Sequence, residues 1–110
     1  MSTRPVLAPQ LFADRRTYFI VDVRERAELD GPLGHIEGAT HAPLAELAAI
    51  AAAWRRDRPI AVVCRSGGRA ARAADLLFDL GFGDVHQVIG GMMAWNYYDL
   101  PTAIVKAKAA

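Results

Sequence analysis

The segment Pro59-Ile-Ala-Val-Val-Cys64-Arg-Ser-Gly-Gly-Arg69 decides how the rest of the 110-residue chain is understood. Its first six residues are uncharged and mostly apolar, which is typical of a strand that is buried on both faces. Two glycines follow the cysteine, and apolar residues then recur at helical spacing as far as Leu80. The segment therefore predicts a buried strand, a tight loop and a helix, with Cys64 at the carboxyl end of the strand.

The rest of the chain alternates between strand-like and helix-like segments. We expect further strands over 17–23, 39–42 and 84–89, an edge strand at 6–7, and helices over 9–16, 44–57, 68–80 and 91–98. Such alternation predicts an α/β fold in which a mostly parallel sheet has helices on both faces. The length suits a single domain over residues 1–110, with 104–110 as a loose tail.

Composition excludes several classes of protein. The chain is 53% hydrophobic and 23% charged with a net charge of +1, as in ordinary globular domains. This charge gives no field suited to nucleic acid, and no apolar run is long enough for a membrane span or a secretion signal. One cysteine and three histidines without ligand spacing predict no metal site, and no motif predicts a cofactor. We therefore expect a cytoplasmic protein with neither nucleic-acid nor membrane partners.

The loop after Cys64 has the residue types of an anion-binding site. Glycine backbones can curl several amide N–H groups toward one point, and the start of a helix adds partial positive charge. Arg65 and Arg69 add two guanidinium groups. These surroundings favour a reactive thiolate over an inert buried cysteine.

Several motifs, in this order along the chain, resemble those of the rhodanese (sulfurtransferase) family, and specifically its small single-domain members. They are Asp22-Val-Arg24-Glu25, Gly34-His-Ile-Glu-Gly-Ala39 followed by Pro43, the Cys64–Arg69 loop, Leu80-Gly-Phe82, and Val88-Ile-Gly-Gly91 with Trp95. The resemblance covers nearly the whole chain. One departure is His41, where the family commonly has Asn; this position lies in a structural segment.

The resemblance implies a five-stranded sheet and a two-step sulfur transfer. Cys64 would take the outer sulfur of thiosulfate or a persulfide donor, become a persulfide, and pass that sulfur to cyanide or to a small-molecule or protein thiol. The resemblance also makes the loop residues candidates for substrate binding: Arg65 and Arg69 for donor oxygens, Ser66 as a hydrogen-bond donor or a local turn contact, and Gly67 and Gly68 for backbone amides.

Two other functions remain as alternatives. Phosphatases and arsenate reductases of related fold use a cysteine and an arginine separated by five residues, whereas four residues separate Cys64 from Arg69. The shorter loop favours a cup for one sulfur atom. A non-catalytic regulatory module would usually lack the cysteine, which this chain retains. Asp22 and Arg24 we interpret as an ion pair that braces a loop.

Overall fold

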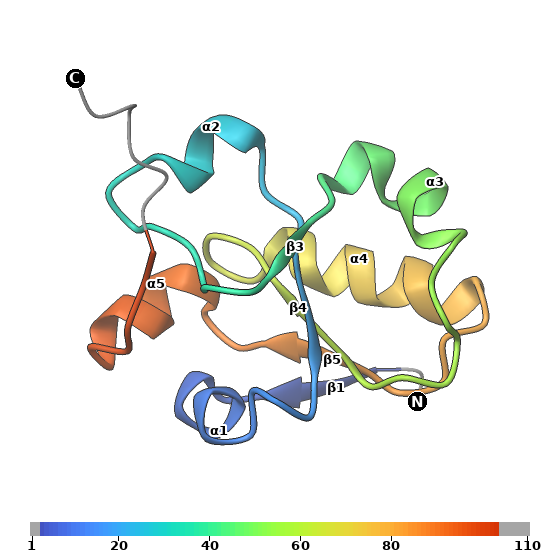
Figure 1. Ribbon diagram of the computed structural model, residues 1–110, viewed down its shortest axis with the longest axis horizontal. Coiled ribbons are helices and arrows are strands. Elements are labelled where there is room, and N and C mark those ends of the chain that lie inside the picture. The colour runs from blue at the N-terminus through green and yellow to red at the C-terminus, as the bar shows by residue number, and fades with distance from the viewer. Residues whose placement is uncertain (1–2, 104–110) are drawn as a thin grey trace.

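The structure, a computed structural model, describes residues 3–103, which form a sheet with helices on both sides (Figure 1). The strands are β1 (Thr3–Val6), β2 (Phe19–Asp22), β3 (Thr40–His41), β4 (Ile60–Val63) and β5 (Val85–Val88). The helices are α1 (Ala8–Ala13), α2 (Arg26–Leu29), the 3-10 turn η1 (Leu44–Glu46), α3 (Leu47–Ala51), α4 (Gly68–Asp79) and α5 (Gly91–Tyr97). The tail predicted at 104–110 lies outside the described residues.

All five strands are parallel, in the order β1-β5-β4-β2-β3. The uncharged run that precedes Cys64 forms β4 at the centre of the sheet, and all four of its residues are buried. In a parallel sheet the carboxyl ends of neighbouring strands meet at one edge. The loops that follow β2 and β4 therefore lie side by side, and they carry Arg24 and Cys64.

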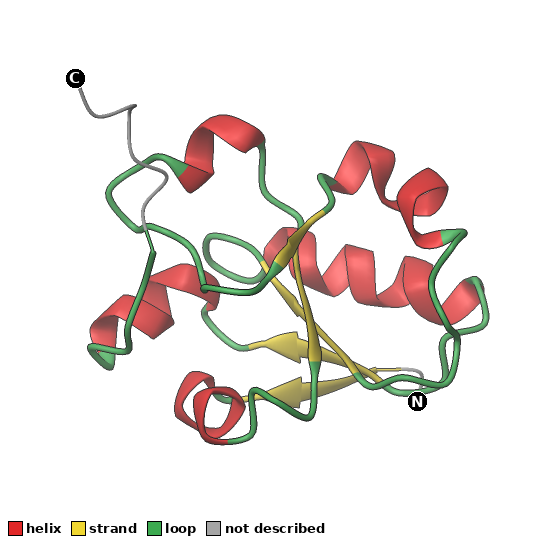
Figure 2. Ribbon diagram, in the orientation of Figure 1, coloured by secondary structure: helices red, strands yellow, loops and turns green. Residues whose placement is uncertain are grey.

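The helices form a layer on each face of the sheet, as the alternating pattern predicts (Figure 2). On one face, Ile60 and Val62 pack in a core with Leu47 of α3 and Leu77 of α4. On the other face, Ala61 and Val63 pack in a second core with Leu11 of α1 and with Met92 and Trp95 of α5. Alternate residues of β4 pack into the two cores, which explains why the sequence of this strand shows no polar face.

The sequence-based boundaries hold best for α4 and α5, which each end one residue earlier than predicted, and least well for the helix predicted over 44–57. That helix is wrong in extent, because an initial 3-10 turn leads into α3, which ends at Ala51. The Arg56 guanidinium closes its end by donating to the carbonyls of Ala51, Ala52 and Trp54 at 3.3, 3.2 and 2.8 Å. The Trp54 ring then packs edge-on against Phe19 at 4.9 Å between ring centroids. Helical spacing predicted the packing of Trp54 against the core, where it is partly buried, but not the turn that achieves it.

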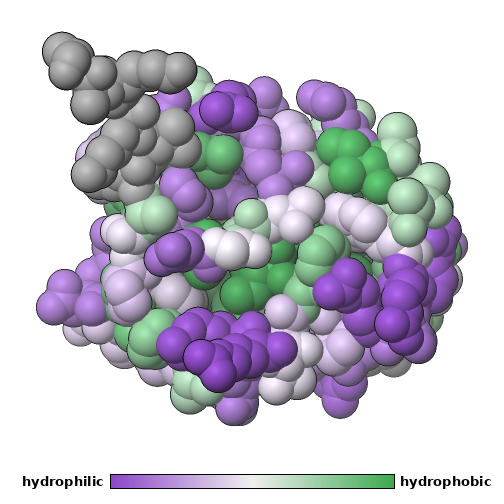
Figure 3. Space-filling view, viewed as in Figure 1, coloured by the Kyte–Doolittle hydropathy of each residue, from purple (hydrophilic) through white to green (hydrophobic). Residues whose placement is uncertain are grey.

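Smaller differences occur at the other ends of elements. The edge strand covers Thr3–Val6 instead of 6–7, and the first helix stops at Ala13 instead of 16. The one-turn helix α2 (Arg26–Leu29) had no counterpart in the periodicity. Among the described helices, none is both long and apolar enough to cross a membrane. On the face drawn in Figure 3, hydrophilic residues surround smaller hydrophobic areas.

Candidate active site

Cys64 follows β4 directly, and its side chain is the acceptor at the centre of a curled loop. The residue is 1% exposed. Its Sγ accepts backbone N–H groups from Gly67 at 3.1 Å and from Ala70 at 3.3 Å. The loop can turn this sharply because Gly67 has φ +122°, a conformation that residues with a Cβ rarely adopt. The structure thus places two amide donors on the sulfur, one of them in the first turn of α4.

The two glycines of the loop are not equivalent. A Cβ on Gly68 would meet no atom within 4 Å, and its φ is not in the positive range. Gly67 is required by its backbone conformation, whereas Gly68 has no such requirement in its surroundings.

A second segment fixes the loop from behind. The first turn of α5 donates to the loop carbonyls, from Met92 N–H to Cys64 O at 2.8 Å and from Met93 N–H to Arg65 O at 3.0 Å. A Cβ on Gly91 would overlap the Cys64 carbonyl oxygen, so this close approach of α5 needs glycine. The conformation of the loop is therefore held from two directions, by its own sulfur and by α5.

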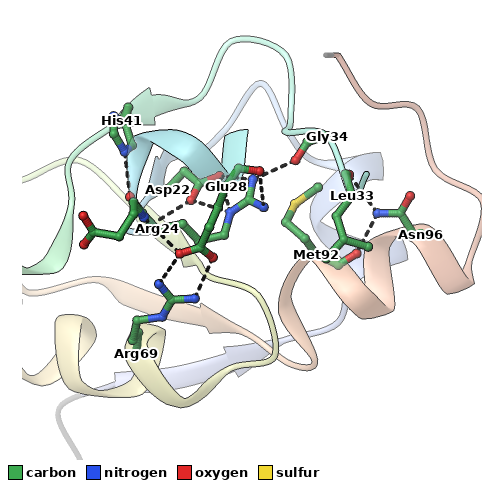
Figure 4. Close-up of polar contacts among 10 residues, drawn as sticks. Asp22, Arg24, Glu28, Leu33, Gly34, His41, Arg69, Met92 and Asn96 are labelled. Carbon is green, nitrogen blue, oxygen red and sulfur yellow. Dashed lines mark hydrogen bonds and ion pairs between the residues drawn. The ribbon is translucent and has the colours of Figure 1, made fainter. Parts of the chain in front are cut away.

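Arg69 lies on α4 and turns toward α2, where it meets Glu28 (Figure 4). The pair is bidentate, with Arg69 Nη1 2.7 Å from Glu28 Oε1 and Nη2 2.9 Å from Oε2. These hydrogen bonds are the main cause that lowers the pKa of Glu28 from 4.5 to about 2, although burial acts in the opposite direction. Hydrogen bonding to Glu28 likewise raises the pKa of Arg69, with smaller contributions from the nearby charges of Glu28, Cys64 and Asp22. The fork of Arg69 is thus engaged by a carboxylate of the protein itself.

Asp22 and Arg24 form the buried brace that the sequence predicts. Arg24 Nη2 lies 2.8 Å from Asp22 Oδ2 and Nε lies 3.0 Å from Oδ1, and the two side chains are 1% and 2% exposed, respectively. Arg24 Nη2 also donates to the Gly34 carbonyl at 2.7 Å, and His41 Nε2 bonds to the Arg24 carbonyl at 2.6 Å (Figure 4). The histidine that departs from the family pattern thus supports the backbone of the Arg24 loop.

Arg65 and Ser66 are exposed at the outer turn of the loop. Arg65 lines a cleft together with Arg24, Glu28 and the segment 31–33. Ser66 lines a separate shallow groove with Gly90, Met93, Ala94, Tyr97 and Tyr98. The six residues predicted as a site therefore lie on the loop after β4 and the first turn of α4, but the side chains of Arg65, Ser66 and Arg69 face different surroundings.

Glu28 is the site residue that the sequence analysis missed. Its signal was the spacing Glu25-x-x-Glu28, which matches a capping box at a helix start. In the structure the Glu28 carboxylate does accept the Glu25 N–H, at 3.2 Å. The spacing could have revealed α2, but the contact with Arg69 depends on the tertiary fold. Among the described residues, no group of three or more His, Cys, Asp or Glu side chains is arranged to hold a metal ion.

The fold and this loop define an α/β domain whose candidate nucleophile is a buried cysteine at the carboxyl edge of a parallel sheet. Comparison with known families gives the particular assignment. Residues 8–97 match the model of the Rhodanese-like domain, and the chain belongs to that family.

Named relatives agree with this assignment. A sulfurtransferase from Allochromatium vinosum is 33% identical over 92 residues, which cover 84% of each chain. The thiosulfate sulfurtransferase GlpE of Shewanella oneidensis is 38% identical over 77 residues, covering 70% of this chain and 74% of its own. Among solved structures, a rhodanese-related protein from Thermoplasma volcanium superimposes with a TM-score of 0.82 at 33% identity, covering 89% of this chain and 95% of that one. The predicted family and fold class are thereby confirmed.

Proposed function

We propose that this chain is a sulfurtransferase that carries sulfane sulfur as a persulfide on Cys64. The Cys64 thiolate attacks the outer sulfur of thiosulfate or of a persulfide. The sulfur–sulfur bond of the donor breaks, and the leaving group, sulfite in the case of thiosulfate, departs with the electron pair. An acceptor thiolate or cyanide then attacks the terminal sulfur and releases Cys64 as the thiolate.

The observation that carries this proposal is the pair of amide donors on Cys64 Sγ, from Gly67 at 3.1 Å and Ala70 at 3.3 Å. Amide donors aimed at a sulfur stabilise negative charge on it, both on the attacking thiolate and on the thiolate released in the second step. Within residues 3–103, the N–H groups of Arg65, Ser66, Gly68 and Arg69 donate to no other backbone or side-chain acceptor. These amides would be available to the terminal sulfur and the donor.

The acceptor half of the reaction needs an external nucleophile. The chain has one cysteine, so no internal thiol can take the sulfur from Cys64. A small thiol or cyanide can serve, and a protein thiol is a further candidate. A protein acceptor is supported by the exposed side chains of Met93, Tyr97 and Tyr98, which lie beside the loop and are 46%, 82% and 48% exposed. Aromatic and methionine side chains are enriched where proteins bind each other.

Phosphatase or arsenate reductase activity is less well supported. Attack on the central atom of a phosphate or arsenate would need the Arg69 fork around that atom's oxygens, whereas thiosulfate is attacked at its outer sulfur. Glu28 already occupies this fork at 2.7 and 2.9 Å. The donors that do face inward converge on a single sulfur atom. This arrangement favours sulfur transfer over hydrolysis of a phosphate ester.

The test is an intact-mass measurement of the chain after incubation with thiosulfate, with Cys64→Ser as the paired variant. We expect the wild type to gain one sulfur atom, to keep it when acceptor is absent, and to lose it when cyanide or a thiol is added. The serine variant should gain nothing and have no turnover, since a hydroxyl forms no persulfide. Its circular dichroism spectrum serves as the control for folding.

Two results would contradict the proposal. Full sulfurtransferase turnover by Cys64→Ser would remove the cysteine from the mechanism. Efficient hydrolysis of an aryl phosphate by the wild type, measured beside its turnover of thiosulfate, would favour the phosphatase alternative.

A further inference from the structure

A cleft lies beside the Cys64–Arg69 loop, and both charged and apolar groups line it. Its volume is about 290 Å³, and it is lined by Arg24, Glu28, Gly31, Pro32, Leu33 and Arg65. That volume is close to the lower end of the range found for organic ligands. The segment 31–33 contributes a wall without charge, so the cleft could hold an organic group beside Arg65, the residue that follows Cys64.

The charged side chains of the cleft are largely neutralised by the protein. Arg24 is paired with buried Asp22, and Glu28 is paired with Arg69. Arg65 is exposed and has no ion pair among the described residues. An incoming donor therefore meets one available guanidinium group, because Glu28 engages that of Arg69.

Resting on the sulfurtransferase function, we propose that Glu28 determines donor specificity: by engaging Arg69 it favours organic sulfane-sulfur donors with a single negative charge over dianionic thiosulfate. Thiosulfate brings two negative charges toward a thiolate, and it would be bound best by two free guanidinium groups. Arg65 supplies one of these, while Glu28 keeps the second from the donor. A donor with one charge and an apolar group needs only Arg65 and the wall at 31–33.

Thiosulfate and methanethiosulfonate differ in their number of negative charges but undergo the same sulfur transfer. In methanethiosulfonate a methyl group replaces one oxyanion of thiosulfate. In both, the Cys64 thiolate bonds to the outer sulfur, the sulfur–sulfur bond breaks, and the electron pair leaves with the oxidised sulfur. The products are the Cys64 persulfide with sulfite in one case and with methanesulfinate in the other.

Glutamine is the suitable replacement at position 28. Its side chain can still accept the Glu25 N–H that the Glu28 carboxylate accepts at 3.2 Å, because Gln serves in a capping box as Glu does. The substitution therefore removes the charge and releases the Arg69 fork while preserving the start of α2. Asp30→Asn is the matched control, because it removes a carboxylate from the end of the same helix at an exposed residue.

The experiment measures kcat/KM for both donors with wild type, Glu28→Gln, Arg69→Gln, the double variant and Asp30→Asn. For Glu28→Gln we expect kcat/KM for thiosulfate to rise about tenfold, mainly through a lower KM, since a freed arginine gains a charged hydrogen bond to the donor. The value of kcat/KM for methanethiosulfonate should change by less than about threefold. The gain should vanish in the double variant, and Asp30→Asn should behave as wild type.

Competitive inhibition of the wild type gives a test that needs no variant. Methanesulfonate should inhibit at a lower concentration than sulfate, because it carries one charge and a methyl group.

Three outcomes would overturn the inference. If kcat/KM for both donors fell equally in Glu28→Gln, Glu28 would act only as a brace of the loop. An unchanged ratio between the donors, or stronger inhibition by sulfate, would remove the charge argument. If the wild type takes sulfur from neither donor, the sulfurtransferase proposal itself fails, and that result is distinct from a wrong specificity.

Discussion

Two arginine–carboxylate pairs lie at the carboxyl edge of this sheet, and they differ mainly in burial. Asp22–Arg24 is 2% and 1% exposed, whereas Glu28–Arg69 is 29% and 30% exposed. Both are bidentate, with shortest distances of 2.8 and 2.7 Å. A buried ion must keep its partner because water cannot replace it, whereas a half-buried ion can exchange its partner for solvent or substrate. The first pair is therefore suited to structure and the second to control of binding.

The strongest test of this contrast is Asp22→Ala. The substitution leaves the Arg24 guanidinium buried without its counter-ion, and it also removes the acceptor of the Arg24 backbone N–H at 3.1 Å. We expect the free energy of unfolding to fall by about 3–5 kcal/mol. Urea unfolding followed by circular dichroism measures this, with Asp30→Asn as a control for loss of an exposed carboxylate. If Asp22→Ala lowered the free energy of unfolding no more than Glu28→Gln does, burial would not distinguish the two pairs.

A smaller effect is expected from the titration of Glu28. Its pKa is about 2 in the folded chain against an ordinary value of 4.5, so the ionised carboxylate stabilises the fold above pH 4.5. This contribution is lost as the pH falls from about 4.5 toward about 2. Because solvent screens the half-exposed pair, we expect it to be worth about 1 kcal/mol.

Unfolding of wild type and Glu28→Gln at a series of pH values measures that contribution. The difference between the two proteins should be constant above pH 5 and should shrink at lower pH. A difference that grew on acidification would contradict the direction of the Glu28 shift.

The smallest effect is expected at a third pair, Arg55–Asp57, whose side chains are 78% and 70% exposed. Hydrogen bonding to Arg55 lowers the pKa of Asp57, yet both groups remain in water. Asp57→Asn should therefore leave the urea midpoint unchanged within the error of measurement at neutral pH. A clear loss would show that geometry outweighs burial in ranking these three pairs.

The sequence predicted those features that depend on neighbouring residues. The strand into Cys64, the tight loop and the helix that follows are local. The apolar run, the two glycines and the helical spacing, respectively, predicted them. The pairing of Asp22 with Arg24 was also accessible, since two residues separate them at a strand end. The order of several motifs along the chain then indicated the family, which no single motif would have identified.

Other features depend on segments that meet only in the folded chain. Glu28 and Arg69 are 41 residues apart, and no local pattern indicates that one neutralises the other. The early end of α3 likewise depends on the guanidinium of Arg56, which folds back over the helix terminus. The catalytic role of Cys64 and the binding of substrate by residues 65–69 remain predictions.

The strand order also has a consequence for how the chain folds as it is synthesised. β1 starts at Thr3, and among the described strands its one partner is β5, where Thr3 lies opposite Val85. Most of the chain must therefore leave the ribosome before its first strand has a partner, and such distant pairings fold slowly. The amides of Met92 and Met93 that hold the loop carbonyls emerge later still. The Cys64–Arg69 loop is thus among the last parts of the nascent chain to be completed, although Cys64 is made well before these amides.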